Sequence, residues 1–349
     1  MNRRSEIKST LQFAALVAFF LLCIEKVLSF FILHLDIETE LIVYGVVILV
    51  VFAGAGILLL FPAVPVPASA QDMRELTDDE LAEVKALLAQ TNRPSIKLTL
   101  HDRPTTPYDS KLGGTPYLPP GFKYPYNKND YSEKMPLKLL CQLNFAQLPP
   151  LKGFPTEGIL QFYLSGEEVE DTYALDYEEP TKQKGWRVVY HEKLIDDATL
   201  LQAPPVLDEA ATENFPLKGE FYIHGELQVT PINDTDKDWL DFWENVFEPS
   251  PIGEQLKDLY AEDEILFSLI NAMDYKMGHR MGGYPCFTQN DPREDTCKGH
   301  SVLLLQLDSE EQGENGIMWG DAGVANFFIT PKALENKDFS RVLYNWDCA

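Results

Sequence analysis

One short sequence pattern occurs twice in this chain, first near residue 112 and again near residue 281. The first copy reads Leu112-Gly113-Gly114-Thr115-Pro116, then Leu140-Cys141-Gln142-Leu143-Asn144, then Gly158-Ile159-Leu160-Gln161-Phe162. The second reads Met281-Gly282-Gly283-Tyr284-Pro285, then Leu304-Leu305-Gln306-Leu307-Asp308, then Gly316-Ile317-Met318-Trp319. Three matched blocks in the same order predict two related halves about a pseudo-twofold axis, with a common core and a seam that could hold a site.

Short strand-like runs separated by Pro and Gly turns dominate both halves. They lie at residues 96–100, 137–144, 159–164, 187–191 and 221–228, and again at 302–307, 317–319 and 325–329. Between the halves, a helical face is formed by Trp239, Trp243, Val246 and Phe247, and we expect this largely aromatic stripe to pack in a core. Thr77 and Glu80 form a capping box that predicts a helix from there to about Gln90.

We therefore expect one mainly β (α+β) domain over residues 71–349. Its repeat halves would cover residues 96–207 and 278–349, and a helical insert would cover residues 234–277.

The formal net charge is −25, from 29 Lys and Arg against 54 Asp and Glu, and nearly all of it lies after residue 70. Such a surface repels phosphate backbones and anionic lipid headgroups, which argues against nucleic-acid binding. It attracts basic partners through long-range steering, and it is also what keeps many domains soluble.

Two apolar stretches precede the acidic domain, at residues 11–35 and 41–61. Each is long enough to cross a hydrocarbon core of about 30 Å as a helix. Residues 1–70 are therefore expected to form a two-helix transmembrane hairpin followed by a Pro/Ala linker.

Basic residues precede the first stretch, and an acidic connection, residues 36–40, separates the two. The positive-inside rule then places the globular domain in the cytoplasm, at the inner (cytoplasmic) membrane. The alternative is an extracytoplasmic domain released by cleavage near Ala70, because Ala68-Ser69-Ala70 is typical of a signal-peptidase site.

The chain resembles the YwqG-like family of bacterial proteins of unknown function over residues 77–349. The motifs that carry the resemblance are Lys111-Leu112-Gly113-Gly114, Gln142-Leu143-Asn144-Phe145, Gly158-Ile159-Leu160-Gln161-Phe162-Tyr163, His279-Arg280-Met281-Gly282-Gly283-Tyr284-Pro285, Gln289 to Arg293 and Trp319-Gly320-Asp321-Ala322-Gly323. The resemblance implies a mainly β, roll-like fold with added helices in a bacterial protein. It brings no established activity and no catalytic residues.

Polar residues cluster around the second Gly-Gly pair, where an enzyme or small-ligand sensor could have its site. The candidate catalytic residues are Asp291, Arg293, His279 and Asp321. The candidate ligand-binding residues are Arg280, Gly282, Gly283, Tyr284 and Gln289. Asp291 has the chemistry of a general base, and an arginine can clamp an anion. The structural alternative is that Asp291 caps a turn and pairs with Arg293.

A second cluster, His279, Cys286, Cys297 and His300, has the ligand types of a tetrahedral zinc site. Its spacing does not match a common zinc motif, and a Cys286–Cys297 disulfide or unpaired thiols are the alternatives. No cofactor is predicted, and zinc is kept as the alternative.

Standard catalytic signatures are missing: there is no nucleophile elbow, no phosphate-binding loop with Lys and no His-Glu-x-x-His helix. The leading hypothesis is a membrane-anchored acidic protein-interaction module that captures a basic protein, with an immunity or antitoxin-type binder as its specific version. The alternative is an enzyme or small-ligand sensor whose site lies at the seam between the two halves.

Overall fold

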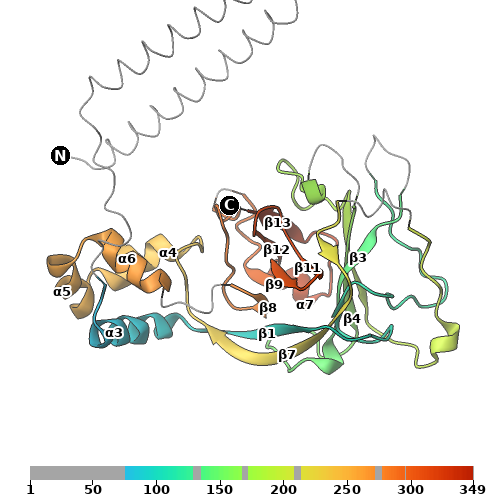
Figure 1. The fold of residues 1–349 in the computed structure, drawn as a ribbon, viewed down its shortest axis with the longest axis horizontal. Helices are drawn as coiled ribbons and strands as arrows, with labels where there is room; N and C mark the ends of the chain where they lie inside the picture. The colour runs from blue at the N-terminus through green and yellow to red at the C-terminus, as the bar shows by residue number, and fades with distance from the viewer. Residues whose placement is uncertain are drawn as a thin grey trace, which may run out of the picture. The chain divides into compact units, whose positions relative to one another are not determined.

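The structure is a computed structural model, and it describes residues 75–128, 135–166, 172–207, 214–271, 277–294 and 296–348. The chain divides into two compact units, Met1–Met73 and Arg74–Ala349, and every described residue belongs to the second. This unit is mainly β, built on a curled ten-stranded antiparallel sheet with a few short helices (Figure 1).

The expected transmembrane hairpin and inner-membrane location are not supported. No helix among the described residues is long and apolar enough to cross a membrane. The longest, α3 (Asp78–Leu88), has 11 residues and therefore spans about 16 Å at about 1.5 Å per residue, roughly half of a hydrocarbon core. The stretches on which both expectations rested, residues 11–35 and 41–61, lie outside the described residues, as does Ala70. The fold class is accordingly corrected to mainly β, without a spanning helix in the described part.

The ten strands are arranged in the order β13-β12-β9-β8-β1-β7-β2-β3-β4-β5. Their bounds are β1 (Arg93–His101), β2 (Lys111–Leu112), β3 (Lys138–Asn144), β4 (Ile159–Leu164), β5 (Trp186–His191), β7 (Phe221–Thr230), β8 (His279–Gly282), β9 (Val302–Asp308), β12 (Val324–Ile329) and β13 (Leu343–Asp347). A separate three-stranded sheet contains β10 (Glu310–Gln312), β11 (Asn315–Ile317) and β6 (Leu217–Lys218).

The long pair β1 and β7 joins two equivalent halves of the large sheet. These strands pair along their length, from Arg93 opposite Thr230 to His101 opposite Tyr222. From β7 the sheet continues through β2, β3, β4 and β5, and from β1 it continues through β8, β9, β12 and β13. The connectivity outward from the centre is the same on both sides, so the halves are related by a pseudo-twofold axis through the central pair.

Buried glutamines mark the same position in the two halves. Gln142 Oε1 on β3 accepts a hydrogen bond from Tyr117 N at 2.9 Å, and Gln306 Oε1 on β9 accepts one from Cys286 N at 2.8 Å. Each backbone donor lies three residues after the second glycine of its Gly-Gly pair. The first two matched sequence blocks therefore occupy equivalent places.

The third sequence match is wrong. The partner of β4 in the second half is β12, where Gln161 Nε2 and Asn326 Nδ2 donate at 2.8 Å to Tyr117 O and Cys286 O respectively. Gly316 and Ile317 lie instead on β11, in the small sheet. A glycine followed by apolar residues can precede any buried strand that follows a turn, so this block alone does not identify the strand.

Curling brings the inner faces of the two halves together into one core. Phe162 of β4 packs against Phe327 of β12 with ring centroids 4.9 Å apart, and Trp186 of β5 lies 5.4 Å from Tyr344 of β13. All four side chains are almost fully buried. Burying an apolar side chain of this size stabilises the fold by about 1.5–3 kcal/mol.

The edge strands β5 and β13 end up close together because the sheet curls. Tyr344 N donates to Pro180 O at 3.1 Å, and Gln183 Nε2 donates to Phe339 O at 2.6 Å. Pro180 and Gln183 precede β5 in the first half, whereas Phe339 precedes β13 in the second. We call this junction of the two edges the seam.

The helices form a second, smaller core at one end of β1 and β7 (Figure 1). This group contains α3, α4 (Trp239–Phe242), the π-helical turn η6 (Trp243–Phe247), α5 (Pro251–Leu259) and α6 (Glu262–Asn271), whereas α7 (Pro331–Glu335) lies between β12 and β13. Short 3₁₀ turns are η2 (Ala89–Thr91), η3 (Phe145–Gln147), η4 (Thr172–Ala174) and η5 (Ala198–Leu200). The predicted capping box is confirmed: Glu80 N donates to Thr77 Oγ1 at 3.3 Å, and Thr77 N donates to Glu80 Oε2 at 2.9 Å. Trp243 and Phe247 are buried in this core, as predicted, whereas Val246 of the same predicted face is 40% exposed.

The Gly-Gly pairs are left-handed bends at the ends of β2 and β8. Gly113 and Gly114 have φ of +62° and +68°, and Gly282 and Gly283 have +66° and +71°. A Cβ atom on Gly283 would overlap Thr230 Oγ1 on β7. Only glycine adopts this conformation without strain, and only glycine leaves room for the neighbouring strand.

We predict that Gly283→Ala lowers the free energy of unfolding by about 3–5 kcal/mol, since a left-handed alanine adds to an overpacked contact. Gly278→Ala is the control, because Gly278 also has a positive φ of +97° but nothing lies within 4 Å of its Cβ position. It should cost only about 1–2 kcal/mol. Urea unfolding followed by tryptophan fluorescence measures both, and equal losses would show that the contact with Thr230 has no effect.

Candidate functional site

Asp291 and Arg293 come together, but in the protein interior. Arg293 Nε donates to Asp291 Oδ1 at 2.8 Å, and its Nη2 donates to Asp236 Oδ2 at 2.9 Å. The side chains of all three are at most 2% exposed. Asp291 also accepts hydrogen bonds from the backbone N–H groups of Lys237 and Arg293.

The electrostatics of this buried triad match a structural role. Burial alone lowers the pKa of Arg293, but hydrogen bonds and ion pairing with Asp291 and Asp236 raise it above its ordinary value. Burial raises the pKa of Asp236, although Arg293 opposes this. Breaking such a buried arrangement leaves an uncompensated charge in the interior, so it holds the two loops that contain Asp236 and Asp291 together.

The other two catalytic candidates lie elsewhere. His279 Nδ1 on β8 accepts a hydrogen bond from Asp308 N at 3.0 Å, and its Nε2 lies 3.2 Å from Glu310 Oε2. Asp321 is exposed on the turn between β11 and β12. The hydrogen bonds and ion pairs of the described residues join neither side chain to Asp291 or Arg293. The four do not form one constellation.

The zinc candidates do not assemble either. No group of three or more His, Cys, Asp or Glu side chains in the described part of the chain is placed to hold a metal ion. Both ring nitrogens of His300 lie within hydrogen-bond distance of backbone carbonyls, those of Cys297 and Arg341. No disulfide joins Cys286 and Cys297, so the alternative bridge is not formed.

The ligand-binding candidates have internal partners. Arg280 is 1% exposed and donates to Met277 O at 2.6 Å. Gly282 and Gly283 form the bend described above, and Tyr284 is buried with the Arg93 guanidinium 3.9 Å from its ring centroid. Gln289, which is exposed, donates through Nε2 to Cys348 O at 2.7 Å.

Arg280 also has a counterpart in the first half, which shows that its burial belongs to the fold. Lys111 on β2 lies opposite Gln142, as Arg280 on β8 lies opposite Gln306. Lys111 donates to the carbonyls of Thr106 and Thr115. Burial lowers the pKa of Lys111 to about 8, although Glu220 and Asp109 favour the charged form.

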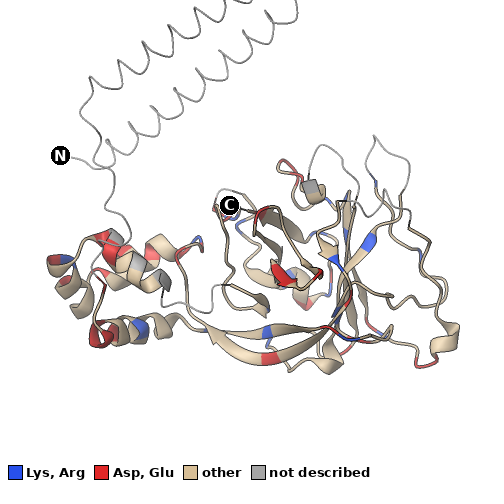
Figure 2. Ribbon diagram, in the orientation of Figure 1, with Lys and Arg blue, Asp and Glu red and all other residues tan. Residues whose placement is uncertain are grey.

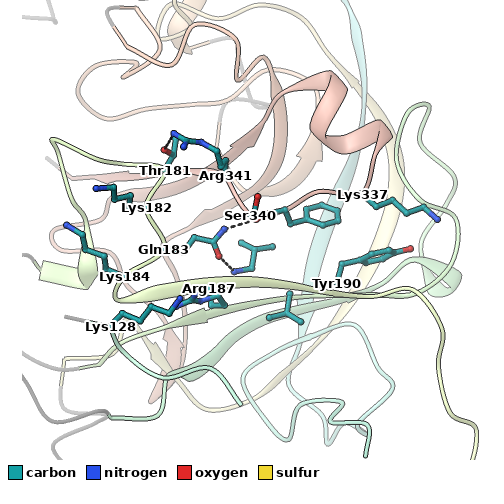
Figure 3. Close-up of a pocket in the computed structure, with 13 residues that line it drawn as sticks. Lys128, Thr181, Lys182, Gln183, Lys184, Arg187, Tyr190, Lys337, Ser340 and Arg341 are labelled. Carbon is teal, nitrogen blue, oxygen red and sulfur yellow. Dashed lines mark hydrogen bonds between the residues drawn. The ribbon is translucent and has the colours of Figure 1, made fainter. Parts of the chain in front are cut away.

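A different set of residues forms a surface groove at the seam (Figure 3). The groove has a volume of about 730 Å³ and is open to solvent. Its lining residues are Lys128, Thr181, Lys182, Gln183, Lys184, Arg187, Val188, Val189, Tyr190, Lys337, Phe339, Ser340 and Arg341. Six of these thirteen are Lys or Arg, and none is Asp or Glu. We call this hollow the basic groove.

Local structure on both sides of the seam positions these cations. The segment before β5 alternates, so Lys182 and Lys184 extend to one side while Gln183 reaches across to Phe339 O (Figure 3). Arg187 lies on β5 itself. Arg341 comes from the other half and donates through Nη2 to Thr181 Oγ1 at 3.1 Å.

Three of the cations are balanced by carboxylates that lie outside the lining. Lys182 pairs with Glu179, Lys184 pairs with Asp176 at 2.7 Å, and Lys337 pairs with Glu192. The other three, Lys128, Arg187 and Arg341, have no carboxylate partner among the described residues. The groove therefore keeps an excess of positive charge.

Among these cations, Arg187 has the least favourable surroundings for its charge. Its Nε and Nη2 atoms are buried without a hydrogen-bond partner among the described residues. Burial lowers the pKa of Arg187. A buried donor without an acceptor costs free energy, about 1–3 kcal/mol, and the charge of an anion in the groove would favour the charged guanidinium.

Sequence reasoning missed the basic groove because its residues come from separate parts of the chain. The one local signal was the run Lys182-Gln183-Lys184 followed by Arg187, a basic segment within an acidic domain. Nothing in the sequence indicated that residues 337–341 lie against it.

We predict that Arg293→Met lowers the free energy of unfolding by about 3–5 kcal/mol, because Asp236 and Asp291 stay buried without their cation. Lys298→Met is the control at an exposed cation, where the change should stay within about 0.5 kcal/mol. Chemical denaturation of the two variants gives the comparison. Wild-type stability of Arg293→Met would contradict the assignment of the triad to the fold.

Comparison with protein-family models matches residues 110–348 to the domain of unknown function DUF1963. No curated protein matches the chain. The matched range includes both Gly-Gly pairs and the whole basic groove, and it is consistent with the resemblance to YwqG-like proteins. Because the match covers more than half of the sequence, the chain belongs to the DUF1963 family, a family of domains of unknown function.

Proposed function

We propose that this domain is a binding protein that holds a short anionic ligand in the basic groove at the seam. The observation that carries the proposal is a groove whose described lining residues include six Lys and Arg and no Asp or Glu, in a chain whose net charge is −25. Such a concentration of cations is opposite to the charge of the rest of the molecule. The proposed site lies at the seam, but its residues are those of the basic groove and not those of the second Gly-Gly block.

The size of the ligand follows from the range of the electrostatic forces. At physiological ionic strength, charges farther apart than about 8 Å are largely screened. A short anion within the groove is therefore attracted by the nearby cations. A long polyanion such as a nucleic acid would extend over the acidic surface and be repelled.

The chemistry of the groove suits carboxylate or phosphate groups. Guanidinium groups such as those of Arg187 and Arg341 bind these anions through paired hydrogen bonds. Thr181 and Ser340, which also line the groove, carry hydroxyl groups that can donate to the same oxygens.

We expect isothermal titration calorimetry to show one-site binding of hexaglutamate or of inorganic pyrophosphate that weakens as NaCl is raised from about 50 to about 300 mM, because salt screens the attraction. Arg187→Gln and Arg341→Gln should each reduce the affinity by about tenfold or more, since a hydrogen bond to a charged group contributes about 1.5–3 kcal/mol. Lys97→Gln, which removes an exposed cation from β1, is the control and should have no effect.

Absence of binding for both anions, or equal losses in the groove variants and in Lys97→Gln, would refute the proposal. Circular dichroism melts of the same proteins establish that each variant is folded.

A basic protein partner is a second proposal, supported by the acidic helical end of the domain (Figure 2). Exposed carboxylates on these helices and their connections are Asp78, Asp79, Glu83, Asp241, Glu244, Glu248, Glu254 and Asp258. Leu240 and Leu259 lie among them and are 58% and 49% exposed. Negative charge beside exposed apolar side chains suits a partner with basic and apolar residues.

Hexalysine should bind to this end, and the variant Asp241→Asn/Glu244→Gln/Glu248→Gln should weaken that binding about tenfold by removing three nearby charges. Hexaglutamate binding in the same variant is the control and should not change. If hexalysine binds the variant as well as the wild type, its site lies on another acidic surface.

A further inference from the structure

A second hollow adjoins the basic groove along the seam. Its volume is about 610 Å³, and it is open to solvent. Its lining residues are Lys152, Gly153, Phe154, Pro155, Val302, Pro331, Leu334, Glu335 and Lys337. Lys337 lines both hollows, so they meet at this residue. Most of the other lining residues are apolar, and we call this the apolar hollow.

Lys337 adopts a backbone conformation that is unusual for lysine. It has φ of +54° at the end of α7, where Lys337 N donates to Leu334 O and Asp338 N donates to Ala333 O. Glycine is the usual residue at this position of a helix C-terminus, because other residues are strained there. Strained residues are frequent at functional sites, and the side chain of Lys337 lines both hollows.

The side-chain amide of Gln183 bridges the two sides of the seam. Gln183 Oε1 accepts a hydrogen bond from Val188 N of β5 at 2.8 Å, and Gln183 Nε2 donates to Phe339 O (Figure 3). Because Val188 directs its N–H away from β4, Tyr190, two residues along, directs its backbone groups to the same side. Gln183 already occupies the N–H of Val188, so the backbone of Tyr190 is the part of this edge that can hydrogen-bond to a peptide in the groove.

From these features we infer that the ligand is an extended peptide segment of a partner protein, with acidic side chains in the basic groove and a terminal bulky apolar side chain in the apolar hollow. This inference rests on the proposed function and specifies its ligand. Charge complementarity identifies the acidic part, and the lining of Phe154, Pro155 and Leu334 identifies the apolar part. Lys337 marks the boundary between the two parts.

A peptide explains the shape of the site better than a small molecule does. Small-molecule pockets enclose most of the surface of their ligand. Here both hollows are open and share Lys337 in their linings. An extended chain that lies along the seam can fill both and also use the edge of β5.

The test compares three end-blocked peptides on the full-length protein: hexaglutamate, pentaglutamate with a leucine added at its amino end, and pentaglutamate with a leucine added at its carboxyl end. One of the two leucine peptides should bind about tenfold more tightly than hexaglutamate, and the other should not, because the apolar hollow adjoins one end of the groove. Phe154→Ala should reduce this gain to less than about threefold. Leu227→Ala, which truncates an exposed side chain on β7, is the matched control and should preserve it.

Lys337→Gly provides a second measurement. Glycine relieves the left-handed strain, so the melting temperature should be unchanged or higher, whereas the affinity for the preferred leucine peptide should fall about fivefold or more. Lys332→Gln, on the exposed side of α7, is the charge control. A Lys337→Gly variant that binds the peptide normally would overturn the role of Lys337.

The outcomes separate this inference from the proposed function. If hexaglutamate or pyrophosphate binds in an Arg187-dependent manner but neither leucine peptide gains affinity, the peptide inference is wrong and the anion site stands. If no acidic ligand binds, both are wrong.

Discussion

The antiparallel pairing of β1 and β7 is the constraint on which the rest of the fold depends. It joins the two halves of the sheet at the centre, from Arg93 opposite Thr230 to His101 opposite Tyr222. Each half then adds four strands in the same order, and the curled sheet brings β5 and β13 together at the seam. The seam thus exists because two equivalent halves curl toward each other from one central pair.

Each half satisfies its interior polar groups in the same way, and this explains the repeated sequence pattern. Gln142 and Gln306 accept hydrogen bonds from the segments that follow the Gly-Gly bends, and Gln161 and Asn326 donate to them. Buried backbone groups must find partners, since an unpaired one costs about 1–3 kcal/mol. The polar residues of the repeated motifs therefore stabilise the fold, and they are poor guides to a binding site.

The distribution of charge distinguishes the seam from the rest of the surface. Acidic side chains give the molecule its net charge of −25, and several lie on the exposed helical end. Cations gather where the edges of the sheet meet, and Arg187 is buried there without a hydrogen-bond partner among the described residues. Electrostatic forces act over short distances in salt solution, so one molecule can attract anions at the seam and cations elsewhere.

The sequence by itself determined the periodic strands, the capping box at Thr77 and the two glycine bends, because these depend on neighbouring residues. The sequence did not indicate β2 or β8. These strands have only two and four residues, and they contain the buried Lys111 and Arg280, so they show no alternation of apolar and polar residues. It predicted that Asp291 could pair with Arg293, but not that Asp236 completes the arrangement. Only the tertiary structure decided where the seam lies. Arg187 and Arg341 are separated by most of the second half of the chain. They share one groove because the sheet curls, and no local sequence pattern encodes this curling.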